Sequence, residues 1–216
     1  LFSKLCKEIT VAAKMGMPDP DQNARLRSAI QAAKAASFPR ENIERAIKKS
    51  SDKAMDSFEE IRYEGFGPAG TSIIVEALTD NRNRSAADVR AIFQKNGGSF
   101  AESGSVSHQF IRYGFLKYPS TISSQDDFFS YAIESGAEDC LFEDDCFEAL
   151  CLPENLSIFY SSLETNFGEP ESSGFLWKPS SLVEVTGEKV KTLFNLLNEL
   201  DDNEDVQSVF SNYDVS

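Results

Sequence analysis

The spacing of apolar residues changes near Phe58, and this change constrains the fold of the 216-residue chain more than any other feature. Before it, apolar residues recur every three or four positions, as they do along one face of an α-helix. After it, β-branched runs separated by Gly and Pro are typical of strands. The sequence therefore predicts a helical unit followed by mixed α and β structure.

The helical spacing occupies three short stretches at the N-terminus. The first covers residues 1–15 and ends at a Gly-Met-Pro-Asp-Pro break, and the second covers residues 23–36. We expect Ser37 to cap a third helix, with Pro39 tolerated in its first turn. Helices this short are marginal on their own, so their apolar faces must pack together. The sequence therefore predicts a three-helix domain over residues 1–56.

Four strands and one helix are expected next, in the order β-β-α-β-β. The strands are expected over residues 59–64, 71–78, 99–101 and 106–113. Ser85 is expected to cap the helix, which ends at Asn96 before a Gly-Gly pair. Residues 119–181 repeat this theme, and residues 182–216 add a helix and a closing strand. The sequence therefore predicts an α+β fold, in which each β-containing part is a sandwich with helices on one face of its sheet.

Charge is unevenly distributed along the chain. The net charge is −14, yet residues 1–55 hold 11 Lys and Arg against 6 Asp and Glu, a net of +5. Residues 119–181 hold 1 against 13, a net of −12, and the remaining segments are also acidic. The basic end can approach phosphate, whereas the acidic end is repelled by it. We therefore expect the two ends to face different partners.

Two clusters of basic residues lie on the expected helices. Three of them are spaced i, i+3 and i+4 on the third helix, with a fourth about one turn earlier, and two more share a narrow face of the first helix. An ordinary solvated helix face is the alternative. Two clusters in a domain of net +5 nevertheless favour contacts to phosphate. These candidate nucleic-acid-binding residues are Lys4, Lys7, Arg40, Arg45, Lys48 and Lys49.

A further candidate is the polar segment at residues 79–85, between an expected buried strand and a helix. Loops in this position carry function more often than the elements they connect. Arg82 and Arg84 offer planar donors to phosphate, close to the N–H groups of a helix terminus. Alternatively, Asp80 ties the loop to these arginines. We include Arg82 and Arg84 among the candidate nucleic-acid contacts and keep the self-tied loop as the alternative.

No catalytic or metal-binding constellation is visible. The G-x-G-x-x-G pattern at residues 65–70 matches a dinucleotide fingerprint, but a strand follows it instead of a helix, so we interpret it as a hairpin turn. The four cysteines form no C-x-x-C pair, His108 is the single histidine, and residues 143–145 lack the spacing of a calcium loop. We therefore expect no enzyme, no metal and no cofactor.

The expected location is the cytoplasm, without a membrane partner. No window approaches the roughly 20 apolar residues that span a bilayer. Cysteines that form neither a disulfide nor a metal site are typical of proteins in the reducing cytosol.

Seven segments of the chain resemble one known family. They are FSKL (2–5), EITVAAK (8–14), NIERAIKK (42–49), YEGFGP (63–68), VEALTDNRNR (75–84), KNGG (95–98) and GSV (104–106). Together they are similar to the YebC/PmpR family, which includes the mitochondrial translational activator of cytochrome oxidase. The match is dense over residues 1–112 and looser beyond. The resemblance also implies a very basic leader ahead of Phe2, which would make the net of +5 an underestimate.

This resemblance implies a fold of three parts. The three-helix domain is followed by a discontinuous ferredoxin-like α+β domain, residues 57–115 plus 181–216. An acidic α+β domain, residues 116–180, is inserted into it. Residues 181–216 would thus return to complete the sheet begun at residues 58–112.

The resemblance further implies a non-enzymatic, DNA-binding transcriptional regulator in the cytoplasm. Other members of the family act in translation, so a ribosome-associated factor that contacts ribosomal RNA is the alternative. A second alternative is a protein-only interaction module that uses the acidic domain.

Overall fold

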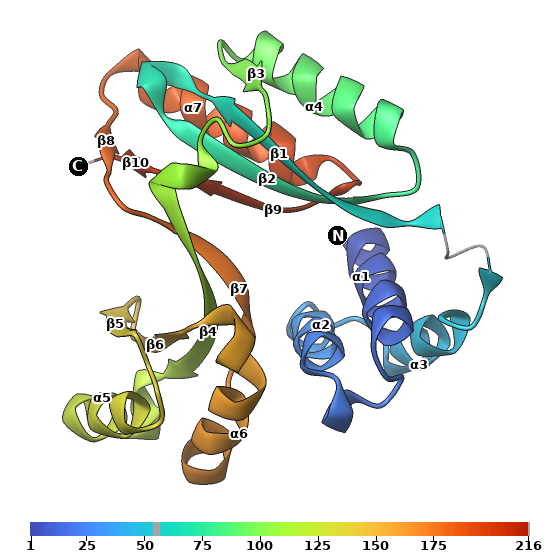
Figure 1. Ribbon diagram of the computed structural model, residues 1–216, viewed down its shortest axis with the longest axis vertical. Helices are drawn as coiled ribbons and strands as arrows, with labels where there is room; N and C mark the ends of the chain where they lie inside the picture. Colours follow the sequence, from blue (N-terminus) through green and yellow to red (C-terminus); the bar gives the residue numbers. More distant parts are fainter. Residues whose placement is uncertain (54–56, 216) are drawn as a thin grey trace.

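The computed structural model describes residues 1–53 and 57–215, which form three parts (Figure 1). The first part contains α1 (Phe2–Met15), α2 (Ala24–Ala35) and α3 (Arg40–Lys49). Its core is made of small and aliphatic side chains, among them the fully buried Ile9 and Leu26. The three helices expected from the apolar spacing are confirmed, while the expected end of this domain at residue 56 lies outside the described residues.

The caps expected for two helices are wrong. Ser37 has a left-handed φ of 57°, and α3 begins at Arg40 because Phe38 first turns inward, where its side chain is buried. Asn81, instead of Ser85, caps the helix α4 (Arg82–Lys95), since its Oδ1 accepts a hydrogen bond from the backbone N–H of Arg84 at 3.0 Å. The capping preference of Ser does not by itself locate the start of a helix, because other residues in the segment can cap it.

The middle part is a four-stranded antiparallel sheet in the order β3-β1-β2-β9, covered on one face by two helices (Figure 1). The strands are β1 (Glu59–Phe66), β2 (Ser72–Thr79), β3 (Ser99–Ala101) and β9 (Val206–Ser211). The helices are α4 and α7 (Glu188–Asp202). Phe93, Leu193 and Leu196 fill the layer between helices and sheet. As expected, the C-terminal segment returns to this sheet, where β9 pairs with β2.

The third part is a second antiparallel sheet, in the order β5-β6-β4-β7. Its strands are β4 (Phe110–Pro119), β5 (Asp139–Glu143), β6 (Cys146–Cys151) and β7 (Ser172–Pro179). One face packs on the helices α5 (Gln125–Glu134) and α6 (Leu156–Phe167). Phe128 stacks on Phe147 in this core, with ring centroids 4.9 Å apart.

One expected strand lies in a different sheet. The strand expected at residues 106–113 was assigned to the middle part, but β4 pairs with β6 and β7 of the third part. The boundary expected at residue 115 therefore falls inside β4. The chain leaves the middle part through a 3₁₀ turn at Ser107–Gln109, and the fourth strand of the middle sheet is β9.

The glycine pattern at residues 65–70 forms a hairpin connection, as expected. Strand β1 ends at Phe66, a 3₁₀ turn covers Pro68–Gly70, and β2 begins at Ser72. Gly70 has a φ of +77°, which a residue with a side chain adopts only under strain. The remaining short elements are Pro20–Gln22, Ser120–Ile122, Pro153–Asn155, Val183–Glu184 and Tyr213–Asp214.

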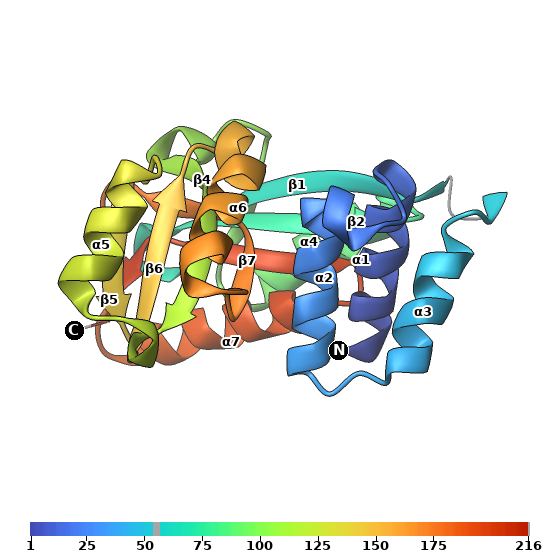
Figure 2. The same ribbon diagram turned by 90° about the horizontal axis from the view of Figure 1, so that it is seen from below.

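In both views, α3 and α5 lie on opposite sides of the molecule (Figures 1 and 2). The helix α3 is thus remote from α5, whereas α2 contacts the acidic third part directly, since Gln31 Nε2 donates to the hydroxyl of Tyr160 at 3.2 Å. Across residues 1–53 and 57–215, no helix has the length and apolar character needed to cross a bilayer.

Candidate nucleic-acid interface

The basic residues of α3 share one exposed face. Ile43 and Ala46 of α3 are buried against α1 and α2, which turns Arg45, Lys48 and Lys49 outward. The structure therefore brings these three residues together, as their i, i+3 and i+4 spacing indicated. All three are exposed.

Two exposed glutamates of α3, Glu41 and Glu44, lie one turn before Arg45 and Lys48. The side chain of Arg40 is 91% exposed and its Nε lies 2.9 Å from Oε1 of Glu44, four residues further along. An exposed pair of this kind contributes at most a few tenths of a kcal/mol, so phosphate can displace it. Within the described part of the chain, Arg45, Lys48 and Lys49 form no ion pair with a carboxylate. We define the α3 face as Arg40, Arg45, Lys48 and Lys49.

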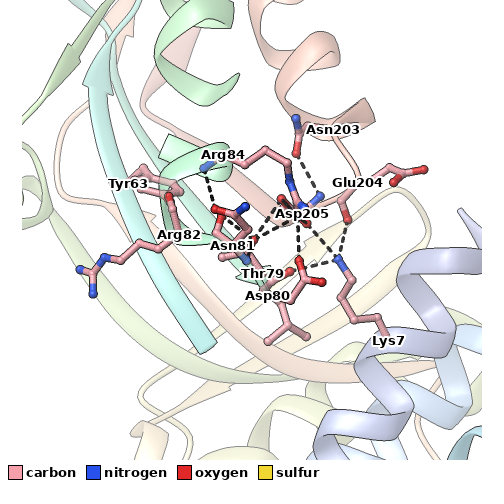
Figure 3. A network of polar contacts seen from close by, with 11 residues as sticks. Lys7, Tyr63, Thr79, Asp80, Asn81, Arg82, Arg84, Asn203, Glu204 and Asp205 are labelled. Carbon is pink, nitrogen blue, oxygen red and sulfur yellow. Dashed lines mark hydrogen bonds and ion pairs between the residues drawn. The ribbon is translucent and has the colours of Figure 1, made fainter. Parts of the chain in front are cut away.

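The lysines of α1 face the protein instead of solvent. Lys7 Nζ donates to the carbonyl oxygens of Leu78 and Glu204, both at 3.1 Å, and to Oδ1 of Asp205 at 3.2 Å (Figure 3). Lys4 Nζ donates to the carbonyl oxygen of Asp201. Burial lowers the pKa of Lys4, although nearby carboxylates oppose this effect. These two candidates are therefore occupied by contacts with the middle part.

Arg84 is also occupied, and the alternative in which Asp80 ties the loop is confirmed for it. Its Nη2 donates to Oδ1 of Asp80 and to Oδ2 of Asp205, both at 2.9 Å (Figure 3). Thr79 donates its hydroxyl to the same Oδ2 atom at 3.1 Å. Burial by itself would raise the pKa of Asp205, but the hydrogen bonds from Arg84, Lys7 and Thr79 outweigh it and lower that pKa.

Arg82 takes a different position from Arg84. Its side chain is 68% exposed and points away from the network around Asp205 (Figure 3). Its Nη1 lies 3.6 Å from Oε2 of Glu59, at the start of β1. Arg82 therefore stays accessible but is not part of the α3 face.

Asp205 is the residue that sequence reasoning missed. It lies in an acidic segment, and no local spacing relates it to its partners, which are 121 and 198 positions away. Its side chain is only 6% exposed. One carboxylate, in the connection between α7 and β9, thus joins α1, the end of β2 and the first turn of α4.

Two of the cysteines are poorly suited to nucleophilic chemistry. Burial raises the pKa of Cys140 to about 11 and that of Cys151 to about 12, with nearby carboxylates acting in the same direction. Both thiols therefore stay protonated at neutral pH, and the thiolate is the reactive form. His108 lies exposed in a 3₁₀ turn. Among the residues described, no three His, Cys, Asp or Glu side chains gather in a way that could hold a metal ion.

Comparisons with known proteins agree over the whole length of the chain. The model of the TACO1/YebC protein N-terminal domain matches residues 1–53, and the model of the TACO1/YebC second and third domain matches residues 58–213. The chain is also similar to a crystal structure of a conserved hypothetical protein from Aquifex aeolicus, with 41% sequence identity and a TM-score of 0.89. That match covers 100% of this chain and 89% of the other.

Proposed function

Because this chain belongs to the TACO1/YebC family, we propose that it is a non-enzymatic regulator of gene expression that binds nucleic acid through the α3 face. The exposed α3 face, with four basic residues against Glu41 and Glu44, supports this proposal most directly. Lys4, Lys7 and Arg84 are left out of the proposed contact because their side chains already bind protein acceptors.

The physical basis is release of counterions from the phosphate backbone. For duplex DNA, the logarithm of the affinity falls linearly with the logarithm of the salt concentration. Each phosphate that a Lys or Arg neutralises adds about −0.9 to the slope of that line. Four contacts therefore predict a slope of about −3 to −4. Phosphate contacts carry no sequence information, so the α3 face by itself predicts binding to many sequences.

Duplex DNA is our first proposed target, in a transcriptional role. The position of α3 on the opposite side of the molecule from α5 supports it, because a duplex bound there lies away from the acidic helix α5 (Figure 2). The proposed place of action is the cytoplasm, where the four free thiols would stay reduced.

The ribosome is the second candidate target. Residues 119–181 carry a net charge of −12, and such a surface favours a basic protein partner. A ribosome offers RNA phosphate to the α3 face and basic proteins to the acidic part, whereas naked DNA offers only phosphate. The third candidate is a module that binds proteins alone through the acidic part.

The test measures binding across a salt series to a promoter duplex, a non-specific duplex and ribosomes. The variant Lys48→Glu/Lys49→Glu reverses two charges on the α3 face. Lys189→Glu/Lys191→Glu is the matched control, because it makes the same charge change at two exposed lysines of α7. We expect the α3 variant to lose at least tenfold in affinity at low salt and to show a shallower salt slope, while the control loses much less.

Each outcome separates the candidates. A sharp preference for one duplex supports transcription. Sedimentation with ribosomes, together with weak and sequence-independent DNA binding, supports translation. Equal losses in the α3 variant and in the α7 control would show that net charge alone matters and would overturn the α3 face. A protein that binds no nucleic acid but captures a basic protein would support the interaction module.

A further inference from the structure

Strand β5 forms an open edge of the sheet in the third part. The strand order is β5-β6-β4-β7, and in the described part of the chain β5 pairs with β6 alone, at the outer end of the sheet (Figure 1). The opposite edge is less accessible, because α2 and β9 contact β7. An open edge strand presents backbone N–H and C=O groups to which a further strand can pair.

The turn after β5 determines which backbone groups face this open edge. Asp144 and Asp145 have φ values of 50° and 57°, as in the two-residue type I′ turn of a hairpin. The residues that flank such a turn form a hydrogen-bonded pair, and every second residue along β5 then directs its backbone groups toward β6. Cys140 and Phe142 therefore direct theirs toward the open edge. The N–H of Cys140 donates to Oδ1 of Asp139 at 2.9 Å, which leaves the N–H of Phe142 and two carbonyl groups for a further strand.

Exposed apolar side chains lie beside the open edge. Phe142 on β5 is 47% exposed and Ile133 on α5 is 61% exposed. The ring of Phe147 lies 5.5 Å from that of Phe142 and 5.9 Å from that of Phe129, so α5 and the edge of β5 flank one ring. Ile133 follows Phe129 by one helical turn and shares its side of α5. Every second side chain of an added strand would contact this apolar surface, because side chains alternate between the faces of a sheet.

The charge of this region identifies the kind of strand that fits. Residues 119–181 carry a net charge of −12, and Glu143 and residues 144–145 at the end of β5 are exposed. Asp139 pairs with Lys178 at 2.8 Å, whereas no ion pair of Glu143 is present among the described residues. Like charges on neighbouring strands destabilise their pairing, so two copies of this edge would repel each other. Nucleic acid would also be repelled, while a strand rich in lysine or arginine would be attracted.

We propose that the β5 edge binds a basic, extended segment of a partner protein, which adds to the four-stranded sheet as a further strand. Backbone hydrogen bonds to β5 hold such a strand, and its alternate side chains give specificity. Apolar side chains of the segment contact Phe142 and Ile133, and its basic side chains lie near Glu143. This site goes beyond the proposed function, because it lies in the third part and uses no residue of the α3 face.

The test uses the full chain and a short labelled peptide in which lysine alternates with valine. Residues directly opposite each other in a sheet have side chains on the same face, so the valine opposite Phe142 directs its N–H toward β5. The lysines direct theirs away. We expect N-methylation of the valines to weaken binding at least tenfold in fluorescence anisotropy. N-methylation of the lysines is the matched control and should change binding less than twofold. A peptide with glutamate in place of lysine should not bind.

Amide hydrogen exchange followed by NMR locates the peptide on the protein. We expect exchange of the Phe142 amide to slow at least tenfold when the peptide saturates the protein. The amide of Leu141 is the internal control, because it already faces β6 and should not change.

Two variants test the side chains of the proposed site. Ile133→Ser removes apolar surface and Glu143→Lys reverses a charge, and we expect each to weaken peptide binding about fivefold. Glu164→Lys makes the same charge change at an exposed position of α6, which packs over β4, and should have less than a twofold effect. A thermal unfolding curve checks that each variant is folded.

Several results would overturn the proposal. These are failure of the lysine peptide to bind, equal binding of the two methylated peptides, and an unchanged Phe142 amide in the complex. Displacement of the peptide by a DNA or RNA strand from the Phe142 amide would assign the edge to nucleic acid. Protection of that amide by a concentration-dependent dimer would assign it to a second copy. Lys48→Glu/Lys49→Glu should leave peptide binding unchanged, so loss of DNA binding in that variant does not affect this test.

Discussion

The Nζ atom of Lys7 on α1 lies 3.2 Å from Oδ1 of Asp205, a residue 198 positions further along the chain. The two side chains are 13% and 6% exposed. The same ammonium group donates to the carbonyl oxygens of Leu78 and Glu204. One lysine therefore fastens the helical part to the end of β2 and to the connection before β9.

We expect Lys7→Met to lower the free energy of unfolding by about 2 kcal/mol, because hydrogen bonds to charged groups contribute about 1.5–3 kcal/mol. Methionine keeps most of the apolar stem and removes the charge. Urea unfolding at neutral pH measures the change. Lys34→Met, at an exposed position on α2, is the control and should change stability by less than about 0.5 kcal/mol. Similar stability for both variants would contradict the proposed role of Lys7.

Stability should depend on pH through Glu64 on β1, whose carboxylate is buried against the segment at residues 104–107. Burial would raise its pKa, but backbone N–H groups of Val106, Gly104 and Ser107 donate to it and lower that pKa below its ordinary value of 4.5. A lowered pKa in the folded state stabilises the protein fully above pH 4.5. This contribution is lost as the pH falls through the lower, folded-state pKa.

Glu64→Gln should therefore lower the free energy of unfolding by about 2 kcal/mol at pH 7, since an amide cannot accept all three N–H groups. The difference from the parent should narrow as the pH falls below 4.5 and through the lowered pKa of the folded parent. Chemical unfolding at pH 7, 5, 4 and 3 measures it. Glu102→Gln changes an exposed carboxylate of the neighbouring loop and should have little effect at any pH. A difference in unfolding free energy between the parent and Glu64→Gln that stays constant with pH would contradict this role of Glu64.

The α+β fold class and most helices could be predicted from the sequence, because apolar spacing is a local property. The first helix, expected over residues 1–15, covers Phe2–Met15 in the structure. The sheet to which β4 belongs could not be predicted in this way. Its partner β7 pairs Phe110 with Pro179, and no local pattern records that choice.

The candidate site likewise contains residues whose positions follow from local spacing and residues whose positions depend on distant parts of the chain. The exposed α3 face followed from the spacing of Arg45, Lys48 and Lys49 on one helix, and their contact with phosphate stays a prediction. The positions of Lys7 and Arg84 depend on Asp205, which is remote in sequence from both. Their charge alone suggested a role at the surface, whereas the tertiary fold uses them to join its parts.

Two glycines of the hairpin at residues 65–70 should differ in how much stability is lost when a side chain is added. A Cβ atom at Gly65 would come within 2.6 Å of the Phe93 ring and 2.7 Å of the Ser99 carbonyl oxygen. We expect Gly65→Ala to lower the free energy of unfolding by about 3 kcal/mol, because the core must shift. Gly70→Ala meets no atom within 4 Å and is opposed only by its φ of +77°, so we expect about 1 kcal/mol. Thermal or urea unfolding ranks the two, and the reverse order would contradict this account.

Stability and nucleic-acid affinity should respond to different arginines and lysines. Arg84 already donates to Asp205 and Asp80, so Arg84→Met should lower the midpoint of urea unfolding while changing the affinity for duplex DNA less than twofold. Lys48→Glu/Lys49→Glu should behave in the opposite way, because both residues are exposed on α3 and reach solvent. Urea unfolding and fluorescence anisotropy with a labelled duplex measure the two quantities on the same preparations. If Arg84→Met weakens binding as much as the α3 variant while the protein stays folded, Arg84 belongs to the interface and must leave Asp205 when nucleic acid binds.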